Sequence, residues 1–246
     1  MTHTVTANRP FVTAVIPCLD EAEAIGDVVR AVLANGAGEV IVVDGGSTDA
    51  TVERARAAGA RVEIERRRGY GRAMQCGLAA LRPDTGIVLF LDGDGSDRPE
   101  RIPDVLAPLH AGTADFVMGS RLKGERENGS LSPAQILAGH LAGALIWLFY
   151  GVRFTDMSPF RAIARDKLET LGMTDDTYGW SLEMQMRVAA KGLRIVELPV
   201  GQRRRVGGVS KVSGDLRMAF KVAWILARTF VRLALRLRAE PRAQRL

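Results

Sequence analysis

Cysteine is scarce in this 246-residue sequence, which contains only Cys18 and Cys76. The two lie singly within apolar segments, so they supply neither a disulfide framework nor the spacing of a cysteine metal site. This cysteine usage fits a reducing cytoplasm. Met1 to Arg9 is polar and lacks an apolar core, so we expect no signal peptide there.

Aromatic residues make up only 6% of the chain, and no nucleic-acid-binding motif accompanies its net charge of +6. Nucleic acid is therefore the least favoured partner. The charge is uneven, because residues 201–246 contain twelve Lys or Arg against two acidic residues, whereas the rest contains 22 basic and 26 acidic residues. A basic tail on a mildly acidic body indicates a phosphate-rich partner, such as a membrane surface or a pyrophosphate.

The chain also lacks any repeat of 20–50 residues, which excludes a solenoid. Instead, short apolar runs alternate with helical patterns through the first half. The predicted strands cover residues 12–17, 40–43, 61–65, 86–91 and 116–118. This alternation predicts an α/β fold with a mostly parallel sheet flanked by helices, and the length suits one such domain.

The fourth of these runs ends abruptly in two carboxylates, Asp92 and Asp94, separated by Gly93. Residues i and i+2 of an extended segment point the same way, so both carboxylates can face one cation. Ligands of open parallel sheets bind beyond the carboxyl ends of the strands. Mg²⁺ is commonly held by one or two carboxylates together with substrate phosphates. The pattern therefore indicates a metal–diphosphate site, although an isolated Asp-x-Asp also suits an acidic turn.

Two stretches of the second half are unusual in composition. Residues 131–152 contain no Asp, Glu, Lys or Arg, and Ser132, Gln135 and His140 interrupt the apolar residues, so a buried or interface-lying helix is favoured over a membrane span. The pattern over 214–238 predicts a helix whose basic stripe opposes an apolar face. The stripe comprises Arg217, Lys221, Arg228, Arg232 and Arg236. The apolar face comprises Val222, Leu226, Phe230, Leu233 and Leu237. Such a helix is typical of a membrane surface; the alternative is packing on its own domain.

Three strand ends together carry a family resemblance: Pro17 to Glu21, Asp44 to Ser47, and Asp92 to Asp94. In this order and spacing they resemble the family 2 glycosyltransferases of the GT-A (Rossmann-like) fold, whose strand ends read P-x-x-N-E, V-D-D-G-S-x-D and D-x-D. The resemblance covers about residues 11–212. Later motifs are similar to the polyprenyl-phosphate (dolichyl-phosphate) glucosyl- and mannosyltransferase branch. They are Gly119 to Arg121, Thr155 to Arg161, and Arg205 to Lys211, which is similar to R-x-x-G-x-S-K.

The resemblance implies roles for the donor-binding residues. Pro17 and Glu21 would line the nucleotide pocket, and Asp44 would contact the base. Asp92 and Asp94, flanking Gly93, would hold Mg²⁺ or Mn²⁺ against the donor diphosphate. The basic segment containing Arg205, Ser210 and Lys211 would close over that diphosphate. Independently, we interpret Gly71 as part of a turn that approaches the nucleotide, because the surrounding glycines lack the spacing of a dinucleotide fingerprint.

Two further residues are implied to act with Asp94 in catalysis. Arg121 would meet the acceptor phosphate or the sugar phosphate. Glu183 occupies the place of an acidic residue that serves as a base or orients the acceptor, and this role is favoured over the alternative of a surface pair with Arg187 at i+4. The sequence departs from the family pattern at three positions: Asp20 replaces Asn, Gly45 replaces Asp, and Ser96 stands where several relatives have Gln.

The resemblance implies an inverting, metal-dependent enzyme that moves a hexose from a UDP- or GDP-sugar to a polyprenyl phosphate or related lipid. It would act at the cytoplasmic face of the membrane, with peripheral contact through residues 214–238. Three alternatives remain: a soluble hydroxyl or glycan acceptor, a sugar-phosphate nucleotidyltransferase, and a non-catalytic membrane scaffold. We expect a flexible N-terminus over 1–10, a catalytic domain over 11–212, and an amphipathic helix and tail over 213–246.

Overall fold

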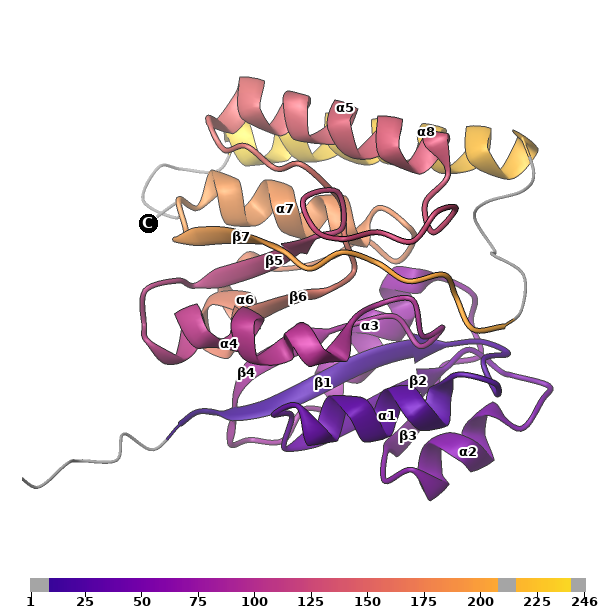
Figure 1. The fold of residues 1–246 in the computed structure, drawn as a ribbon. Helices are drawn as coiled ribbons and strands as arrows, with labels where there is room; N and C mark the ends of the chain where they lie inside the picture. The colour runs from indigo at the N-terminus through magenta and orange to yellow at the C-terminus, as the bar shows by residue number, and fades with distance from the viewer. Residues whose placement is uncertain (1–8, 208–215, 240–246) are drawn as a thin grey trace, which may run out of the picture.

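A computed structural model describes residues 9–207 and 216–239 of the chain. Its centre is a seven-stranded sheet with the order β3-β2-β1-β4-β6-β5-β7 (Figure 1). The strands are β1 (Phe11–Cys18), β2 (Glu39–Asp44), β3 (Arg61–Ile64), β4 (Thr85–Phe90), β5 (Phe116–Ser120), β6 (Arg161–Ala164) and β7 (Ile195–Pro199). The sheet confirms the predicted fold class, and β1, β2 and β4 run parallel so that their carboxyl ends share one edge.

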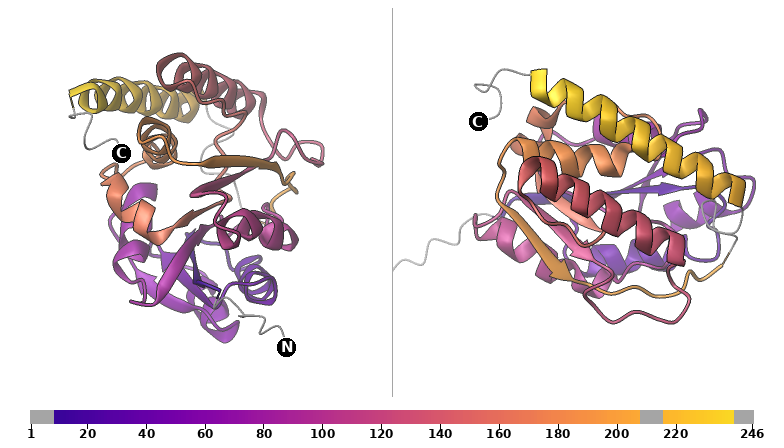
Figure 2. Two further views of the ribbon diagram at one scale, coloured as in Figure 1. Left: turned by 90° about the vertical axis from the view of Figure 1, so that its left-hand side faces the viewer. Right: turned by 90° about the horizontal axis from the view of Figure 1, so that it is seen from above.

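Helices cover both faces of this sheet. They are α1 (Ile25–Ala34), α2 (Thr51–Ala57), α3 (Tyr70–Ala79), α4 (Ile102–His110), α5 (Pro133–Tyr150), α6 (Arg165–Leu171), α7 (Trp180–Ala190) and α8 (Leu216–Ala239). One core cluster joins the sheet to α1 and α4, and a second joins its other face to α3, α6 and α7. α5 and α8 form an outer layer beyond α7 (Figure 2).

Strand β6 was missed by the sequence patterns. It lies between β4 and β5 and pairs antiparallel with both, whereas the remaining pairings of the sheet are parallel. Its four residues begin with a charged side chain and form neither an apolar run nor an alternation of the kind that predicts a strand. The consequence for the site is direct, because β6 brings the segment 155–161 beside the end of β4.

The apolar face of α8 lies differently from the expectation. Phe230, Leu233 and Leu237 are buried against the domain rather than turned outward, and Phe230 packs edge-on against Phe149 of α5 at a centroid distance of 5.3 Å. A helical wheel identifies an apolar face but not what covers it. The interpretation that this face contacts a membrane is therefore wrong for these three residues.

Helix α5 is the one helix among the described residues whose length and apolar composition suit a bilayer crossing. One narrow side packs closely on the domain through Gly139, Ala142, Gly143 and Ile146. A Cβ added to Gly143 would overlap the carbonyl oxygen of Phe154, so this glycine is required for the close approach. The opposite side of α5 is exposed.

Candidate active site

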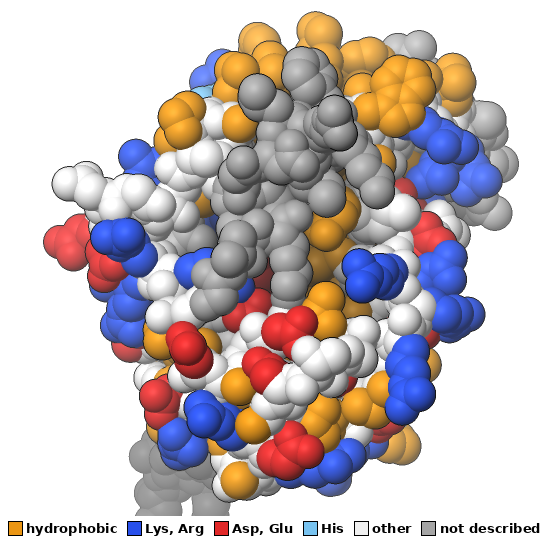
Figure 3. Space-filling model, turned by 90° about the vertical axis from the view of Figure 1, so that its right-hand side faces the viewer, with side chains coloured by type: hydrophobic (Ala, Val, Ile, Leu, Met, Phe, Trp, Pro, Cys, Tyr) orange, Lys and Arg blue, Asp and Glu red, His pale blue; other side chains and the backbone are white. Residues whose placement is uncertain are grey.

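A cavity of about 920 Å³ opens at the carboxyl ends of β1 and β4. Figure 3 looks onto this edge of the molecule and shows acidic side chains near its centre with Lys and Arg side chains around them. Of the expected site residues, those lining the cavity are Pro17, Glu21, Asp92, Gly93, Asp94, Arg121 and Arg205. The structure therefore brings together residues from four regions that are far apart in the sequence.

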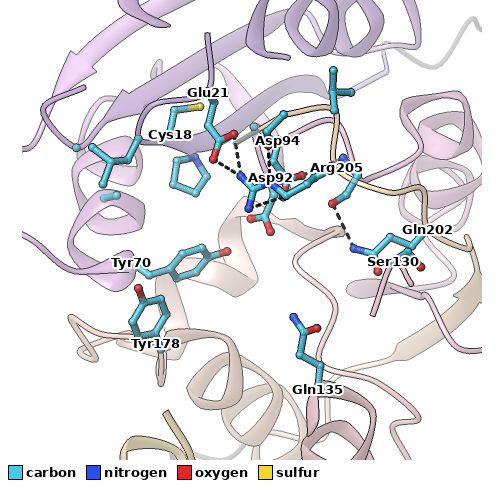
Figure 4. Close-up of a pocket in the computed structure, with 18 of the residues that line it drawn as sticks. Cys18, Glu21, Tyr70, Asp92, Asp94, Ser130, Gln135, Tyr178, Gln202 and Arg205 are labelled. Atoms are coloured by element: carbon cyan, nitrogen blue, oxygen red, sulfur yellow. Dashed lines mark hydrogen bonds and ion pairs between the residues drawn. The ribbon is translucent and has the colours of Figure 1, made fainter. Parts of the chain in front are cut away.

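Asp92 and Asp94 lie at the turn that follows β4, in the middle of the cavity (Figure 4). The turn holds their positions with its own backbone: Ser96 N donates to Asp94 Oδ1 at 2.9 Å, and Asp92 N donates to Asp97 Oδ2 at 2.9 Å. A Cβ at Gly93 would overlap Cys18 Sγ, so only glycine lets β1 approach this closely.

The electrostatics of this turn suit a divalent cation. Burial, followed by the nearby charges of Asp97 and Asp94, raises the pKa of Asp92 well above its usual range, and burial raises the pKa of Asp97 to about 7. Asp97 Oδ1 is buried without a hydrogen-bond partner. Negative charge is thus in excess here, and a hard cation would relieve it. Among the described residues there is no group of three or more His, Cys, Asp or Glu placed to hold a metal ion.

The raised pKa of Asp97 predicts a pH dependence of stability in metal-free protein. An unfolded Asp titrates near pH 3.9, so between about pH 4 and pH 7 the folded chain binds one proton more, and its free energy of unfolding falls as the pH rises. We expect the loss between pH 5 and pH 7 to be about 2 kcal/mol larger in the wild type than in Asp97→Asn. Urea unfolding in EDTA across this range measures the difference. Parallel profiles for the two proteins would contradict the raised pKa.

Glu21 and Arg205 close one side of the cavity. Arg205 Nη2 lies 2.7 Å from Glu21 Oε1, and Arg205 Nη1 lies 3.8 Å from Asp94 Oδ2. Val206 N donates to the backbone oxygen of Asp94 at 3.1 Å, which holds this segment against the acidic turn. A guanidinium is therefore available beside the carboxylates, where a diphosphate would need one. Ser210 and Lys211, expected in the same basic segment, lie outside the described residues.

Arg121 is fixed by a two-pronged ion pair with Asp156. Its Nε and Nη2 lie 2.7 Å from the two carboxylate oxygens, and both side chains are almost completely buried. The pair spans from the end of β5 to the segment before β6, so the antiparallel insertion of β6 creates it. Arg121 also lines the cavity, where the part of its guanidinium that Asp156 does not occupy can bind an anionic group.

Asp44 does not reach the cavity. Its carboxylate is 1% exposed and accepts hydrogen bonds from Gly46 N and Ser47 N at 2.9 Å and from Ser47 Oγ, so it shapes the loop after β2. Its neighbour Gly45 lines the cavity, and the base contact that the resemblance implies for Asp44 stays a prediction. Asp20 acts in the same loop cluster: its φ is +54°, a conformation that Asn and Asp tolerate, and it accepts from Thr48 N at 2.8 Å. The Asn-to-Asp departure therefore preserves a backbone role.

Glu183 and Gly71 also lie outside the cavity, and both support the segment 174–179. Glu183 is fully buried and accepts from Thr174 N at 3.0 Å, from Asp175 N at 2.6 Å and from Arg187 Nε at 2.9 Å. Gly71 packs on the opposite side, where its N–H donates to Thr177 O at 3.1 Å. Glu183 does not line the cavity, and the role as a base or acceptor-orienting residue that the resemblance implies stays a prediction.

The close approach at Gly71 makes a testable prediction. A Cβ there would overlap the carbonyl oxygen of Asp175, which is backbone and cannot rotate away. We expect Gly71→Ala to lower the free energy of unfolding by about 1–3 kcal/mol. Gly26→Ala in α1 is the matched control, because its new Cβ would lie 3.5 Å from the nearest atom, and there we expect a gain of about 0.4–1 kcal/mol. Equal effects in urea unfolding would contradict the packing argument.

Several cavity residues were not identified from the sequence. Tyr70 at the start of α3 and Tyr178 after the 174–177 turn lie side by side on one wall, and Gln135 of α5 lies across the cavity from Glu21 (Figure 4). Gln202 donates to Ser96 Oγ at 3.2 Å, while its own Oε1 is buried without a partner. Tyr70 and Gly69 belong to the glycine-containing stretch that we interpret as approaching the nucleotide, and both line the cavity. No local motif marks Gln135 or Gln202, which only the topology brings to the site. The amide of Gln202 lies beside Ser96, the position at which several relatives have Gln.

Comparisons with known proteins show which family the chain resembles. The family model described as Glycosyl transferase family 2 matches residues 13–172. An uncharacterized glycosyltransferase of Mycobacterium tuberculosis is 38% identical over 209 residues, which cover 84% of this chain and 91% of the relative. A dolichyl-phosphate hexose transferase of Haloferax volcanii is 35% identical over 192 residues, which cover 76% of this chain and 81% of the relative.

A similar fold is also found among solved structures. The crystal structure of glucosyl-3-phosphoglycerate synthase from Mycobacterium tuberculosis, in complex with Mn²⁺, uridine diphosphate and phosphoglyceric acid, aligns with a TM-score of 0.73 at 26% identity. The alignment covers 93% of this chain and 79% of that chain. The relatives named here thus include a lipid-phosphate transferase by sequence and a soluble-acceptor synthase by structure.

Proposed function

The chain belongs to glycosyl transferase family 2, and from this premise we propose that it transfers a hexose from a UDP- or GDP-sugar to a polyprenyl phosphate or a related lipid phosphate. Family membership confirms the resemblance and the nucleotide-sugar chemistry, and it sets aside the nucleotidyltransferase and the non-catalytic scaffold. The donor nucleotide, the sugar and the acceptor are the proposed part.

One observation carries the proposed acceptor: a single cavity holds the acidic pair on one side and the first turn of α5 on the other. Gln135 lines the cavity, and the whole of α5, 18 residues long, contains no Asp, Glu, Lys or Arg. Arg121 lines the same cavity and can bind a phosphate. An acceptor with a phosphate head and an apolar chain matches this succession of a cationic group and an apolar helix.

The chemistry requires no strong base when the acceptor is a phosphate monoester. A phosphate oxygen attacks C1 of the sugar, a new C1–O bond forms, and the bond from C1 to the nucleoside diphosphate breaks with its electron pair on the leaving group. This single displacement inverts the configuration at C1. Arg121 would position the attacking phosphate, and Arg205 would stabilise the charge that develops on the diphosphate.

Asp92 and Asp94 are the residues that would hold Mg²⁺ or Mn²⁺, as their position at the strand end and the excess negative charge of the turn support. The cation would supply electrostatic stabilisation of the departing diphosphate. Glu21 would keep Arg205 beside this group.

With a lipid acceptor, the enzyme would work at the cytoplasmic surface of a membrane. The catalytic domain would cover residues 11–212, and residues 214–238 would make the peripheral membrane contact. The basic composition of residues 201–246 supports this contact with anionic lipid. The relative named as a dolichyl-phosphate hexose transferase supports the same acceptor class.

A soluble phosphorylated hydroxyl compound is the second candidate acceptor. The structural similarity to glucosyl-3-phosphoglycerate synthase favours it, because that protein was crystallised with a small phosphorylated acid. Arg121 could bind the phosphate of such a molecule equally well. The attacking hydroxyl would then need a base within hydrogen-bond reach, and Glu183 lies outside the cavity.

A partition assay separates the two acceptors. Purified enzyme is incubated with Mn²⁺ and radiolabelled UDP-glucose or GDP-mannose, together with either undecaprenyl phosphate in detergent or 3-phosphoglycerate. We expect label in the organic phase with the lipid acceptor and none with the small acid. Label that stays in the aqueous phase as a glycosylated acid would overturn the lipid proposal and establish the soluble one.

A further inference from the structure

The described surface carries one concentrated apolar area, on the outer layer formed by α5 and α8. Nine of the eleven large hydrophobic side chains that are exposed among the described residues belong to these two helices. Those on α5 are Leu137, Leu141, Leu145, Trp147, Leu148 and Phe149. Those on α8 are Trp224, Val231 and Leu235. Exposure reaches 71% at Leu148 and 70% at Trp224, which is unusual for a soluble surface unless a partner covers it.

The two helices present this area as one face. Both lie over α7 as the outermost layer, as Figures 1 and 2 show from three directions, and they meet through the ring contact of Phe149 with Phe230. On α5, Leu137, Leu141, Leu145 and Leu148 follow one another at intervals of four, four and three residues, so they line one side of the helix. Their row is about 16 Å long.

The charge of these two helices favours a lipid surface as the partner that covers the apolar area. Residues 131–153 and 216–239 contain seven Lys or Arg and no Asp or Glu. Arg228 and Arg236 are exposed on α8, and the guanidinium of Arg153 lies 4.9 Å from the ring of Trp147. A layer with only positive charge would repel a second copy of itself, whereas it attracts the anionic headgroups of a lipid surface. Exposed tryptophans beside arginines are the residue types enriched where protein meets the headgroup region.

We propose that α5 and α8 together form a docking face that lies flat on an anionic membrane, with the leucine row of α5 and Trp224, Val231 and Leu235 of α8 inserted among the lipids. The close packing of Gly143 on Phe154 keeps α5 against the domain, in the plane of the surface instead of across the bilayer. Because Gln135 opens α5 and lines the cavity, this orientation leads a lipid phosphate to Arg121. The inference rests on the proposed lipid acceptor and adds the face, the orientation and the route to the site.

Vesicle binding tests the docking face directly. Wild-type protein is sedimented with vesicles of phosphatidylglycerol or of phosphatidylcholine, and the same samples are followed by tryptophan emission. Trp180 is fully buried, so a blue shift on binding reports Trp147 and Trp224. We expect binding and a blue shift with phosphatidylglycerol, and much weaker binding with phosphatidylcholine. Absence of sedimentation with phosphatidylglycerol would overturn the proposal.

A double variant provides the matched comparison. Leu141→Gln with Leu148→Gln removes two exposed side chains and should weaken vesicle binding at least about tenfold. Ile64→Gln, at a side chain 44% exposed on β3, should bind as the wild type does. Unchanged binding by the double variant would refute the face. So would a concentration-dependent dimer, seen by light scattering, that the double variant breaks without any vesicle binding by the wild type.

A water-soluble acceptor separates this inference from the proposed function. With a short-chain prenyl phosphate in solution, the double variant should transfer sugar at the wild-type rate, because its leucines lie outside the cavity. Loss of that activity in the double variant would count against a docking role. Failure of the wild type to use any prenyl phosphate would instead refute the proposed acceptor, whatever its vesicle binding.

Discussion

Replacing Asp94 by Asn should reduce sugar transfer by about 10³-fold, equivalent to about 4 kcal/mol of transition-state stabilisation. The substitution keeps the size of the side chain and its acceptor for Ser96 N, so the turn after β4 should keep its shape. It removes one of the two carboxylates that would hold the cation against the diphosphate. Initial rates with saturating Mn²⁺ and nucleotide sugar measure the effect.

The control for this experiment is Asp104→Asn on α4. Asp104 is about half exposed and pairs with Arg101 at 3.1 Å, so its loss should change neither activity nor stability by a measurable amount. Thermal stability of metal-free protein gives a second readout, because removing a charge from the crowded turn should leave Asp94→Asn at least as stable as the wild type. Full activity of Asp94→Asn would refute the metal-binding role of this pair.

The general position of the site was predictable from the sequence. The apolar runs before Asp92 and Asp44 identify strands, and the parallel order places their ends on one edge. Asp92 and Asp94 both line the cavity, but they lie in the turn after β4 and not in the strand itself. The inference that held is the one from sheet topology, which applies to long buried strands.

Contacts made by short or covered elements were not predictable. β6 has four residues and no periodic signal, yet it sets the Arg121–Asp156 pair. The wheel of α8 showed an apolar face correctly, but the domain covers part of it with Phe230 and Leu233 buried. The helical period predicts which side of a helix is apolar, but the partner of that side is set by the tertiary structure.

Motif residues proved to be of two kinds. Asp92 and Asp94 line the cavity, whereas Asp44 and Glu183 hold the loops that form its wall through hydrogen bonds to backbone N–H groups. A family motif marks both kinds alike, because a carboxylate that shapes a loop is as specific in its geometry as one that binds a ligand. Burial and hydrogen-bond partners separate them.

Glu183 provides the sharpest test of that distinction. Its carboxylate is completely buried and pairs with Arg187, which is itself 8% exposed. Glu183→Ala would leave the Arg187 charge and the N–H groups of Thr174 and Asp175 without their acceptor. We therefore expect the free energy of unfolding to fall by about 3–5 kcal/mol, as measured by urea unfolding.

Glu183→Gln distinguishes support from base catalysis. The amide keeps the volume and one acceptor oxygen, so a supporting role predicts lower stability with a rate per folded molecule within a few-fold of the wild type. A base that deprotonates a hydroxyl acceptor predicts the opposite: wild-type stability, a loss of about 10²-fold or more in kcat, and disappearance of the acidic limb of the pH–rate profile. The second outcome would place Glu183 in the reaction and favour the soluble acceptor over the lipid phosphate.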